Sequence, residues 1–191
     1  MTSIENSIKI LKNGGIGILP TDTIYGIVAS ALNKKAVLKV YKLRKRNPQR
    51  PFIILISSLA DLNLFGIKLN AVVKKVLKKV WPGKISVILK CNSKRFKYLH
   101  RGIKTLAFRL PSKKWLRRLL KKTGPLVAPS ANWEGEPPAK NIKEARKYFE
   151  NRIDFYVDAG KLESLPSTLI AFDENGKVII LRRGAERISV L

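Results

Sequence analysis

The sequence predicts an α/β protein with a single twisted, mixed sheet flanked by helices. Segments with helical periodicity alternate with short apolar segments typical of buried strands. Some consecutive strands have no helix between them, which argues against a purely parallel, doubly wound sheet. The 191 residues and the hydrophobic content of 45% suffice for one domain with a sizeable core. We therefore expect a single domain over residues 1–191.

The chain begins with a helix, a buried strand and a polar loop. Ser3 is a good N-cap for the helix, which ends at residues 14–15, a pair of glycines. The strand that follows stops at Pro20, because proline cannot donate to a sheet ladder. Residues 21–26 are then expected to form a loop that leads toward the second helix.

Caps, apolar periodicity and breakers predict the remaining elements. Further helices are expected after Asn33, near 58–63, and over 70–81, 112–122 and 141–150. Further strands are expected over 52–56, 85–89, 105–110, 126–128, 155–157, 167–172 and 178–181.

The charge of the chain is strongly positive. Lys and Arg number 39 against 13 Asp and Glu, which gives a net charge of +26. Such an excess indicates an anionic ligand, nucleic acid or a proteome rich in lysine. Much of it lies on the outer faces of predicted helices, where charge is usually solvated, so an electrostatic surface for RNA stays an open alternative.

Several classes of protein are excluded by composition. A single cysteine, Cys91, excludes an internal disulfide, and a single histidine, His100, excludes a His-rich metal site. No run of about 18 apolar residues is present, and the N-terminus lacks the order of a secretory signal. We expect a cytoplasmic protein that does not enter a membrane and that offers no metal site of its own.

Small polar residues gather where predicted strands end. Residues 21–25 place three hydroxyls and one carboxylate within five positions, directly after the first strand. Ser130 and Asn132 follow another strand and face the same way if the segment is extended. Ser167 opens a later strand. Ligands collect at such strand ends in open sheets, although each cluster alone could be an ordinary capped turn.

Arginines are the second ingredient of the predicted site. Arg44, Arg46 and Arg50 lie on a segment that prolines make irregular, and an arginine fork matches phosphate oxygens. Arg109 has apolar neighbours and must meet an anion, which could be a ligand or a structural ion-pair partner. Arg182 ends the last strand. These groups suit positioning and charge neutralisation better than covalent catalysis.

Five segments, in this order, resemble the YrdC/TsaC family. They are Pro20-Thr21-Asp22-Thr23-Ile24-Tyr25-Gly26, Arg44-Lys45-Arg46, Pro129-Ser130-Ala131-Asn132, Ser167-Thr168 and Leu181-Arg182-Arg183-Gly184. The resemblance covers nearly the whole chain and is to the short form of L-threonylcarbamoyladenylate synthase, without the extra C-terminal domain. It implies a YrdC-like fold with a concave, positively charged cavity.

The resemblance also implies a reaction. L-threonine, bicarbonate and ATP, with Mg²⁺ carried by ATP, would give threonylcarbamoyl-AMP and pyrophosphate. The product would serve t6A modification of tRNA through downstream transferase proteins, and the basic surface could contact tRNA.

Site roles follow from the resemblance, residue by residue. The threonine-binding residues would be Thr21, Thr23, Tyr25, Arg109 and Ser167, and the ATP-binding residues would be Arg44, Arg46, Arg50, Ser130, Asn132 and Arg182. No covalent catalytic residue is implied, and positioning would fall to Arg46, Ser130 and Asn132. Arg44 stands where the family usually has lysine, which keeps the charge and changes its shape.

Two alternative functions remain open from the sequence. The first is a module that binds structured or double-stranded RNA on a basic concave surface and performs no chemistry. The second is a carbamoyl-transfer enzyme, because a related domain occurs in larger carbamoyl-handling proteins.

Overall fold

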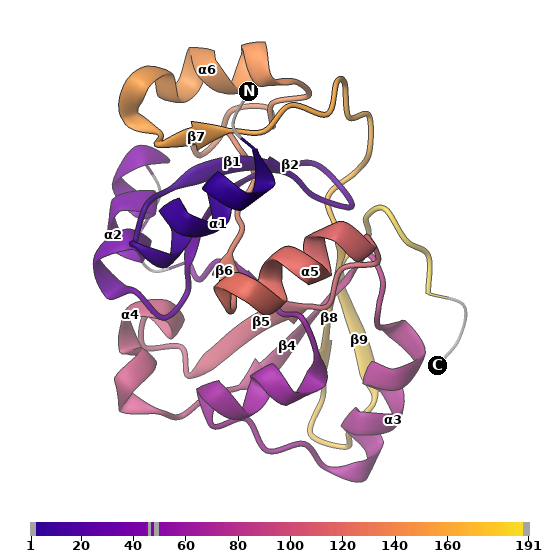
Figure 1. The fold of residues 1–191 in the computed structure, drawn as a ribbon. Helices are drawn as coiled ribbons and strands as arrows, with labels where there is room; N and C mark the ends of the chain where they lie inside the picture. The colour runs from indigo at the N-terminus through magenta and orange to yellow at the C-terminus, as the bar shows by residue number, and fades with distance from the viewer. Residues whose placement is uncertain (1–2, 46, 48–49, 189–191) are drawn as a thin grey trace.

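A mixed sheet of nine strands runs through the part of the chain that the structure, a computed structural model, describes: residues 3–45, 47 and 50–188 (Figure 1). The strand order is β7-β1-β2-β6-β3-β5-β4-β8-β9. The strands are β1 (Gly17–Pro20), β2 (Tyr25–Ser30), β3 (Ile53–Leu55), β4 (Ile85–Lys90), β5 (Thr105–Arg109), β6 (Leu126–Val127), β7 (Phe155–Tyr156), β8 (Thr168–Phe172) and β9 (Val178–Arg182). Parallel and antiparallel pairs both occur, so the predicted mixed α/β sheet is confirmed.

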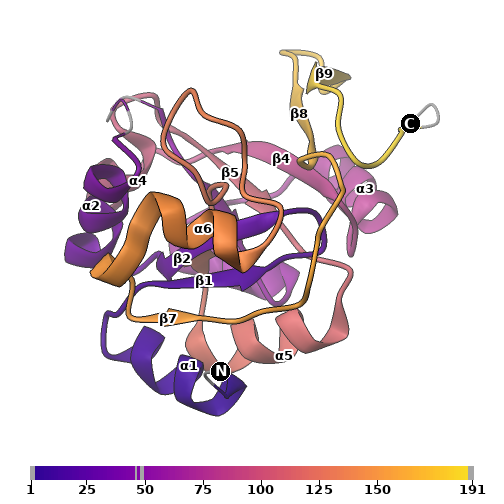
Figure 2. The same ribbon diagram turned by 90° about the horizontal axis from the view of Figure 1, so that it is seen from above.

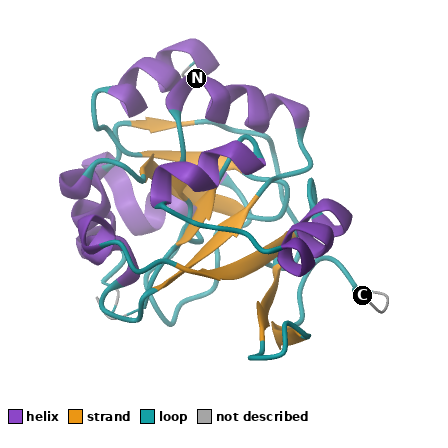
Figure 3. Cartoon of the chain, turned by 90° about the horizontal axis from the view of Figure 1, so that it is seen from below, coloured by secondary structure: helices purple, strands orange, loops and turns teal. Residues whose placement is uncertain are grey.

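Helices pack on both faces of this sheet (Figure 3). They are α1 (Ile4–Lys12), α2 (Lys34–Leu43), α3 (Ala71–Val80), α4 (Lys97–His100), α5 (Lys114–Thr123) and α6 (Ile142–Phe149), with 3-10 helices η1 (Leu59–Phe65), η2 (Lys94–Phe96) and η3 (Glu150–Arg152). No helix in the described ranges has the length and apolar content needed to cross a membrane.

Side-chain caps start four of the helices, because the first backbone N–H groups of a helix lack partners within it. Each cap accepts a hydrogen bond from the N–H three residues ahead, and the caps are Ser3, Asn33, Asn70 and Asn141. The sequence predicts three of these caps, Ser3, Asn33 and Asn141, and it places Asn70 at the start of its helix.

Strand β2 corrects the sequence analysis, which expected a loop over residues 21–26 and no strand before Asn33. Tyr25 and Gly26 are the first two residues of β2, and Tyr25 lies opposite Pro20 of β1. The strand is interior to the sheet and is buried on both faces, so its residues show no apolar–polar alternation. Only residues 21–24 form the connection, which makes the predicted loop a tight turn between two neighbouring strands.

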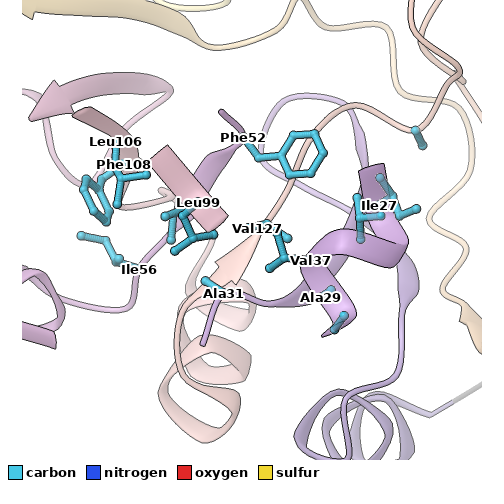
Figure 4. Packing of buried hydrophobic residues seen from close by; sticks show 14 of the residues in the cluster. Ile27, Ala29, Ala31, Val37, Phe52, Ile56, Leu99, Leu106, Phe108 and Val127 are labelled. Atoms are coloured by element: carbon cyan, nitrogen blue, oxygen red, sulfur yellow. The ribbon is translucent and has the colours of Figure 1, made fainter. Parts of the chain in front are cut away.

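The core has two apolar layers, one on each face of the sheet. On one face, α1 and α5 place Leu11 and Leu116 in a cluster with Leu19 and Leu55. Figure 2 shows these two helices together below β1 and β7. On the other face a larger cluster includes residues of β2, α2, β3 and β5, and Figure 4 shows part of it: Ile27, Ala29, Ala31, Val37, Phe52, Ile56, Leu99, Leu106, Phe108 and Val127.

Candidate active site

A cavity of about 380 Å³ lies among the residues that follow β1 and β6, the end of β5, the start of β8 and the end of β9. Its polar lining residues are Thr21, Thr23, Tyr25, Arg44, Thr105, Arg109, Ser130, Ser167 and Arg182. Its apolar lining includes Ile24, Phe52, Ile53, Ile88, Ile103 and Leu169. The cavity therefore combines three arginines and several hydroxyls with apolar walls. The sequence analysis predicted that polar residues from distant segments form one site, and most of these residues line this cavity.

The turn between β1 and β2 fixes the direction of its hydroxyls. The Thr21 hydroxyl donates to the Ile24 carbonyl at 2.7 Å and accepts the Thr23 backbone N–H at 3.1 Å. The two threonine hydroxyl oxygens are 3.0 Å apart. Because the single hydrogen of Thr21 is used by Ile24, the Thr23 hydroxyl is the donor in that pair. Thr23 therefore keeps acceptor capacity, and it lines the cavity.

Tyr25 lines the cavity, but its hydroxyl is bound elsewhere. That hydroxyl donates to the Gly160 carbonyl at 2.8 Å and accepts the Ala159 backbone N–H at 2.9 Å. The Asp158 carboxylate lies 3.3 Å from the same oxygen. Burial raises the pKa of Tyr25, and the nearby Asp158 charge raises it further against the opposing Ala159 hydrogen bond. The ring of Tyr25 thus serves the cavity while its hydroxyl anchors the loop at 158–160.

Arg109 ends β5 in a buried ion pair with Asp22. Its Nη2 lies 3.1 Å from Asp22 Oδ1, and the two side chains are 5% and 1% exposed. The other oxygen of Asp22 accepts the backbone N–H of Ser112 at 3.0 Å. Burial lowers the pKa of Arg109, and the Asp22 charge opposes that effect. The sequence left open whether the anion beside Arg109 is a ligand or a structural partner, and Asp22 is such a structural partner. Arg109 also lines the cavity, and its Nε has no acceptor among the described residues.

Arg44 joins the predicted basic segment to the turn after β6. Its Nε donates to the Asn132 carbonyl at 3.0 Å, and its Nη2 donates to Asn132 Oδ1 at 3.1 Å and to Ser130 Oγ at 3.2 Å. Arg44 is 3% exposed, so it is not part of a solvated helix end. Ser130 and Asn132 share Arg44 as a partner, but the segment is not extended as the sequence analysis assumed: the Asn132 backbone N–H donates to the Ser130 carbonyl at 3.0 Å in a tight turn. Asn132 itself is not among the residues that line the cavity.

Arg182 binds the residue that precedes β8. Its Nη2 donates to the Ser167 carbonyl at 2.8 Å and lies 3.4 Å from Ser167 Oγ. Burial lowers the pKa of Arg182. Gly184 follows two residues later, where a Cβ atom would lie 2.2 Å from the Pro166 carbonyl oxygen. Only glycine allows the end of β9 to run this close to the segment that carries Ser167.

Three further residues complete the comparison with the sequence. Arg50 does not line the cavity; its side chain is 71% exposed, and its Nη1 is 3.8 Å from Glu134 Oε1. Arg46 lies outside the described residues. Thr105, at the start of β5, lines the cavity and was missed by sequence reasoning. A hydroxyl at the beginning of a strand was the available signal.

The chain is similar to known proteins over most of its length. The family model Sua5_yciO_yrdC, described as "Telomere recombination", matches residues 9–184. A protein of Methanocaldococcus jannaschii, named provisionally as a threonylcarbamoyl-AMP synthase, is 33% identical over 96% of this chain and 86% of its own length.

Longer relatives match as well. Threonylcarbamoyl-AMP synthase of Bacillus subtilis is 30% identical over 82% of this chain and 46% of its own length. The crystal structure of Pyrococcus abyssi Sua5 complexed with L-threonine superposes with a TM-score of 0.87 at 27% identity, over 95% of this chain and 54% of that one. The chain thus spans about half the length of these two proteins. It belongs to the Sua5/YciO/YrdC family.

Proposed function

We propose that this protein is an L-threonylcarbamoyl-AMP synthase, a nucleotidyltransferase that forms its product and pyrophosphate from L-threonine, bicarbonate and ATP. The observation that carries the proposal is Arg109. Asp22 already balances the charge of Arg109, but the buried Nε–H lacks an acceptor among the described residues, and a ligand carboxylate in the cavity that Arg109 lines would supply one. The synthase names of the relatives and the threonine bound to the Pyrococcus protein favour a carboxylate over an RNA phosphate.

On the threonine side, the cavity offers groups that match an amino acid. Arg109 would bind the carboxylate, and the free acceptor capacity of Thr23 suits an N–H donor such as the amine or the carbamate. Thr21 holds Thr23 in place, the Tyr25 ring forms a wall, and Ser167 lies beside Arg182. This assignment uses all five residues predicted for threonine.

On the ATP side, the cations and the turn after β6 would hold the nucleotide. Arg44, at the end of α2, and Arg182, at the end of β9, contribute guanidinium groups, and Ser130 adds a hydroxyl. Asn132 would act by fixing Arg44. Arg46 and Arg50, which follow α2 in the sequence, would bind the outer phosphates.

The chemistry requires proximity more than a reactive side chain. The threonine amine would capture CO₂ derived from bicarbonate, and an oxygen of the resulting carbamate would attack the α-phosphorus of ATP. Pyrophosphate would leave with its charge balanced by the arginines and by the Mg²⁺ that accompanies ATP. Holding the carbamate and the α-phosphate together in an apolar-walled cavity is the contribution of the protein. We place this reaction in the cytoplasm and within one domain over residues 1–191.

The decisive test is pyrophosphate release by the purified protein with ATP and Mg²⁺, with and without L-threonine and bicarbonate. The proposal requires release that depends on both, together with mass-spectrometric detection of threonylcarbamoyl-AMP. Arg109→Ala should raise KM for threonine far more than KM for ATP. A matched control is Arg118→Ala, since Arg118 is an exposed arginine of α5 away from the cavity lining. Release that ignores threonine would refute the proposal.

The product would pass to the proteins that complete t6A on tRNA. The net charge of +26 also supports a direct contact with tRNA on the basic surface. Binding of tRNA that weakens steeply with salt, in the same preparation that makes the product, would support this contact. Binding that does not change between low and high salt would exclude it.

A further inference from the structure

Ser86 is a buried serine that touches a site residue without lining the cavity. It lies in β4, which pairs with β8, and it is 0% exposed. Its Oγ is 2.8 Å from the Oγ of Ser167, which precedes β8 and lines the cavity. The sequence assigns Ser86 no role, because a single serine within an apolar strand is usually only a small core residue.

The direction of this hydrogen bond follows from the partners of each hydroxyl. Among the described residues, Ser167 Oγ is the only side-chain partner that Ser86 Oγ has. A fully buried hydroxyl hydrogen needs an acceptor, so Ser86 donates and Ser167 accepts. The other neighbour of Ser167 Oγ is Arg182 Nη2 at 3.4 Å, which is also a donor.

Ser167 Oγ is thus surrounded by two donors. Its own hydrogen has no acceptor among the described residues, and the side of Ser167 left open is the cavity. A hydroxyl whose acceptor capacity is used within the protein can offer a ligand only its hydrogen.

We propose that Ser86 is a positioning residue: it fixes Ser167 as a hydrogen-bond donor toward the ligand, so that the ligand group facing Ser167 is an acceptor oxygen. The inference rests on the proposed function, in which that oxygen belongs to the carboxylate or carbamate of L-threonine. Thr23 is the counterpart, because its hydrogen goes to Thr21 and it faces the cavity as an acceptor. One donor hydroxyl and one acceptor hydroxyl thereby select the orientation of an amino acid.

A double-mutant cycle tests this role. Dissociation constants for L-threonine and for ATP are measured by calorimetry for the wild type, Ser86→Ala, Ser167→Ala and the double variant. Ser86→Ala should weaken threonine binding roughly fivefold, the loss of about one hydrogen bond, and should leave ATP binding unchanged. In the Ser167→Ala background the same substitution should have no further effect on threonine, since Ser86 acts only through Ser167.

Two controls separate positioning from packing. Ser7→Ala removes another serine that is 0% exposed, whose hydroxyl donates to the Ser3 carbonyl at 3.0 Å in α1, and it should leave threonine binding unchanged. Ser86→Cys keeps the shape of the side chain with a larger γ atom and a weaker donor, so it should resemble Ser86→Ala in threonine affinity.

Several results would overturn the inference. Unchanged threonine affinity in Ser86→Ala would do so, as would equal losses for threonine and ATP, or a full effect of Ser86→Ala in the Ser167→Ala background. Wild-type affinity in Ser86→Cys would reassign Ser86 to packing alone. If the wild type bound no threonine and released no pyrophosphate, the proposed function would fall together with this inference, whereas an additive cycle in an active enzyme overturns only the role of Ser86.

Discussion

Replacing Asp22 by asparagine should destabilise the protein strongly, because it leaves a buried guanidinium without a counter-charge. Asp22 Oδ1 faces Arg109 Nη2 at 3.1 Å, while Oδ2 accepts from the backbone N–H and, at 3.3 Å, from the hydroxyl of Ser112. An amide has only one oxygen, so its NH₂ must face donors on one side or the other. Removing one partner of a buried pair costs about 3–5 kcal/mol. Because the amide keeps one of the two contacts, we expect a loss of about 3 kcal/mol.

The free energy of unfolding is measured by urea denaturation, with tryptophan fluorescence and circular dichroism as the signals. A loss of this size corresponds to a decrease in Tm of roughly 6–12 °C for a chain of this length. The double variant Asp22→Asn/Arg109→Met should be more stable than Asp22→Asn alone, because it removes the unpaired charge as well. If Asp22→Asn cost less than about 1 kcal/mol, or if the two substitutions were additive, the ion pair would not have the energetic role inferred here.

Three further predictions concern other contacts. Gly184→Ala should lower the free energy of unfolding by about 2 kcal/mol and raise KM for threonine, since its Cβ would lie 2.2 Å from the Pro166 carbonyl; unchanged values in urea unfolding and kinetics would contradict this. Arg44→Lys should cost about 1–2 kcal/mol in urea unfolding, because an ammonium cannot reproduce the fork that binds Ser130 and Asn132, and a neutral outcome would show that charge alone suffices there. Burial raises the pKa of Tyr25 above 10.0, so its contribution to stability is complete below pH 10 and is lost as the pH rises through the folded-state pKa. The free energy of unfolding of Tyr25→Phe should therefore decline less steeply at alkaline pH than that of the wild type. An equal decline would be inconsistent with this account.

The parts of the fold that the sequence predicted are those set by local chemistry. Asn33 and Asn141 cap their helices through the third residue ahead, so a short window contains the whole signal. Strand β2 was missed because it is covered on both faces and follows β1 after a turn of only four residues, which leaves neither alternation nor a long loop to mark it.

In the site, the sequence identified residues that need a partner, but it did not identify the partners themselves. The apolar neighbours of Arg109 required an anion, but Asp22 is brought to it by the packing of distant strands. Ser86 and Ser167 are 81 positions apart and meet only because β4 and β8 pair in parallel. No local pattern carries such register, so these contacts could not be read from the chain.

The position of Arg182 at the end of β9 has a consequence for how the protein is made. Thr21 and Thr23 are translated well before Arg182 and Gly184, which hold the Ser167 segment. A nascent chain that stops before β9 would contain most of both core layers and still lack a complete cavity. A ligand that needs the whole cavity therefore cannot be held until β9 has been translated and has paired with β8.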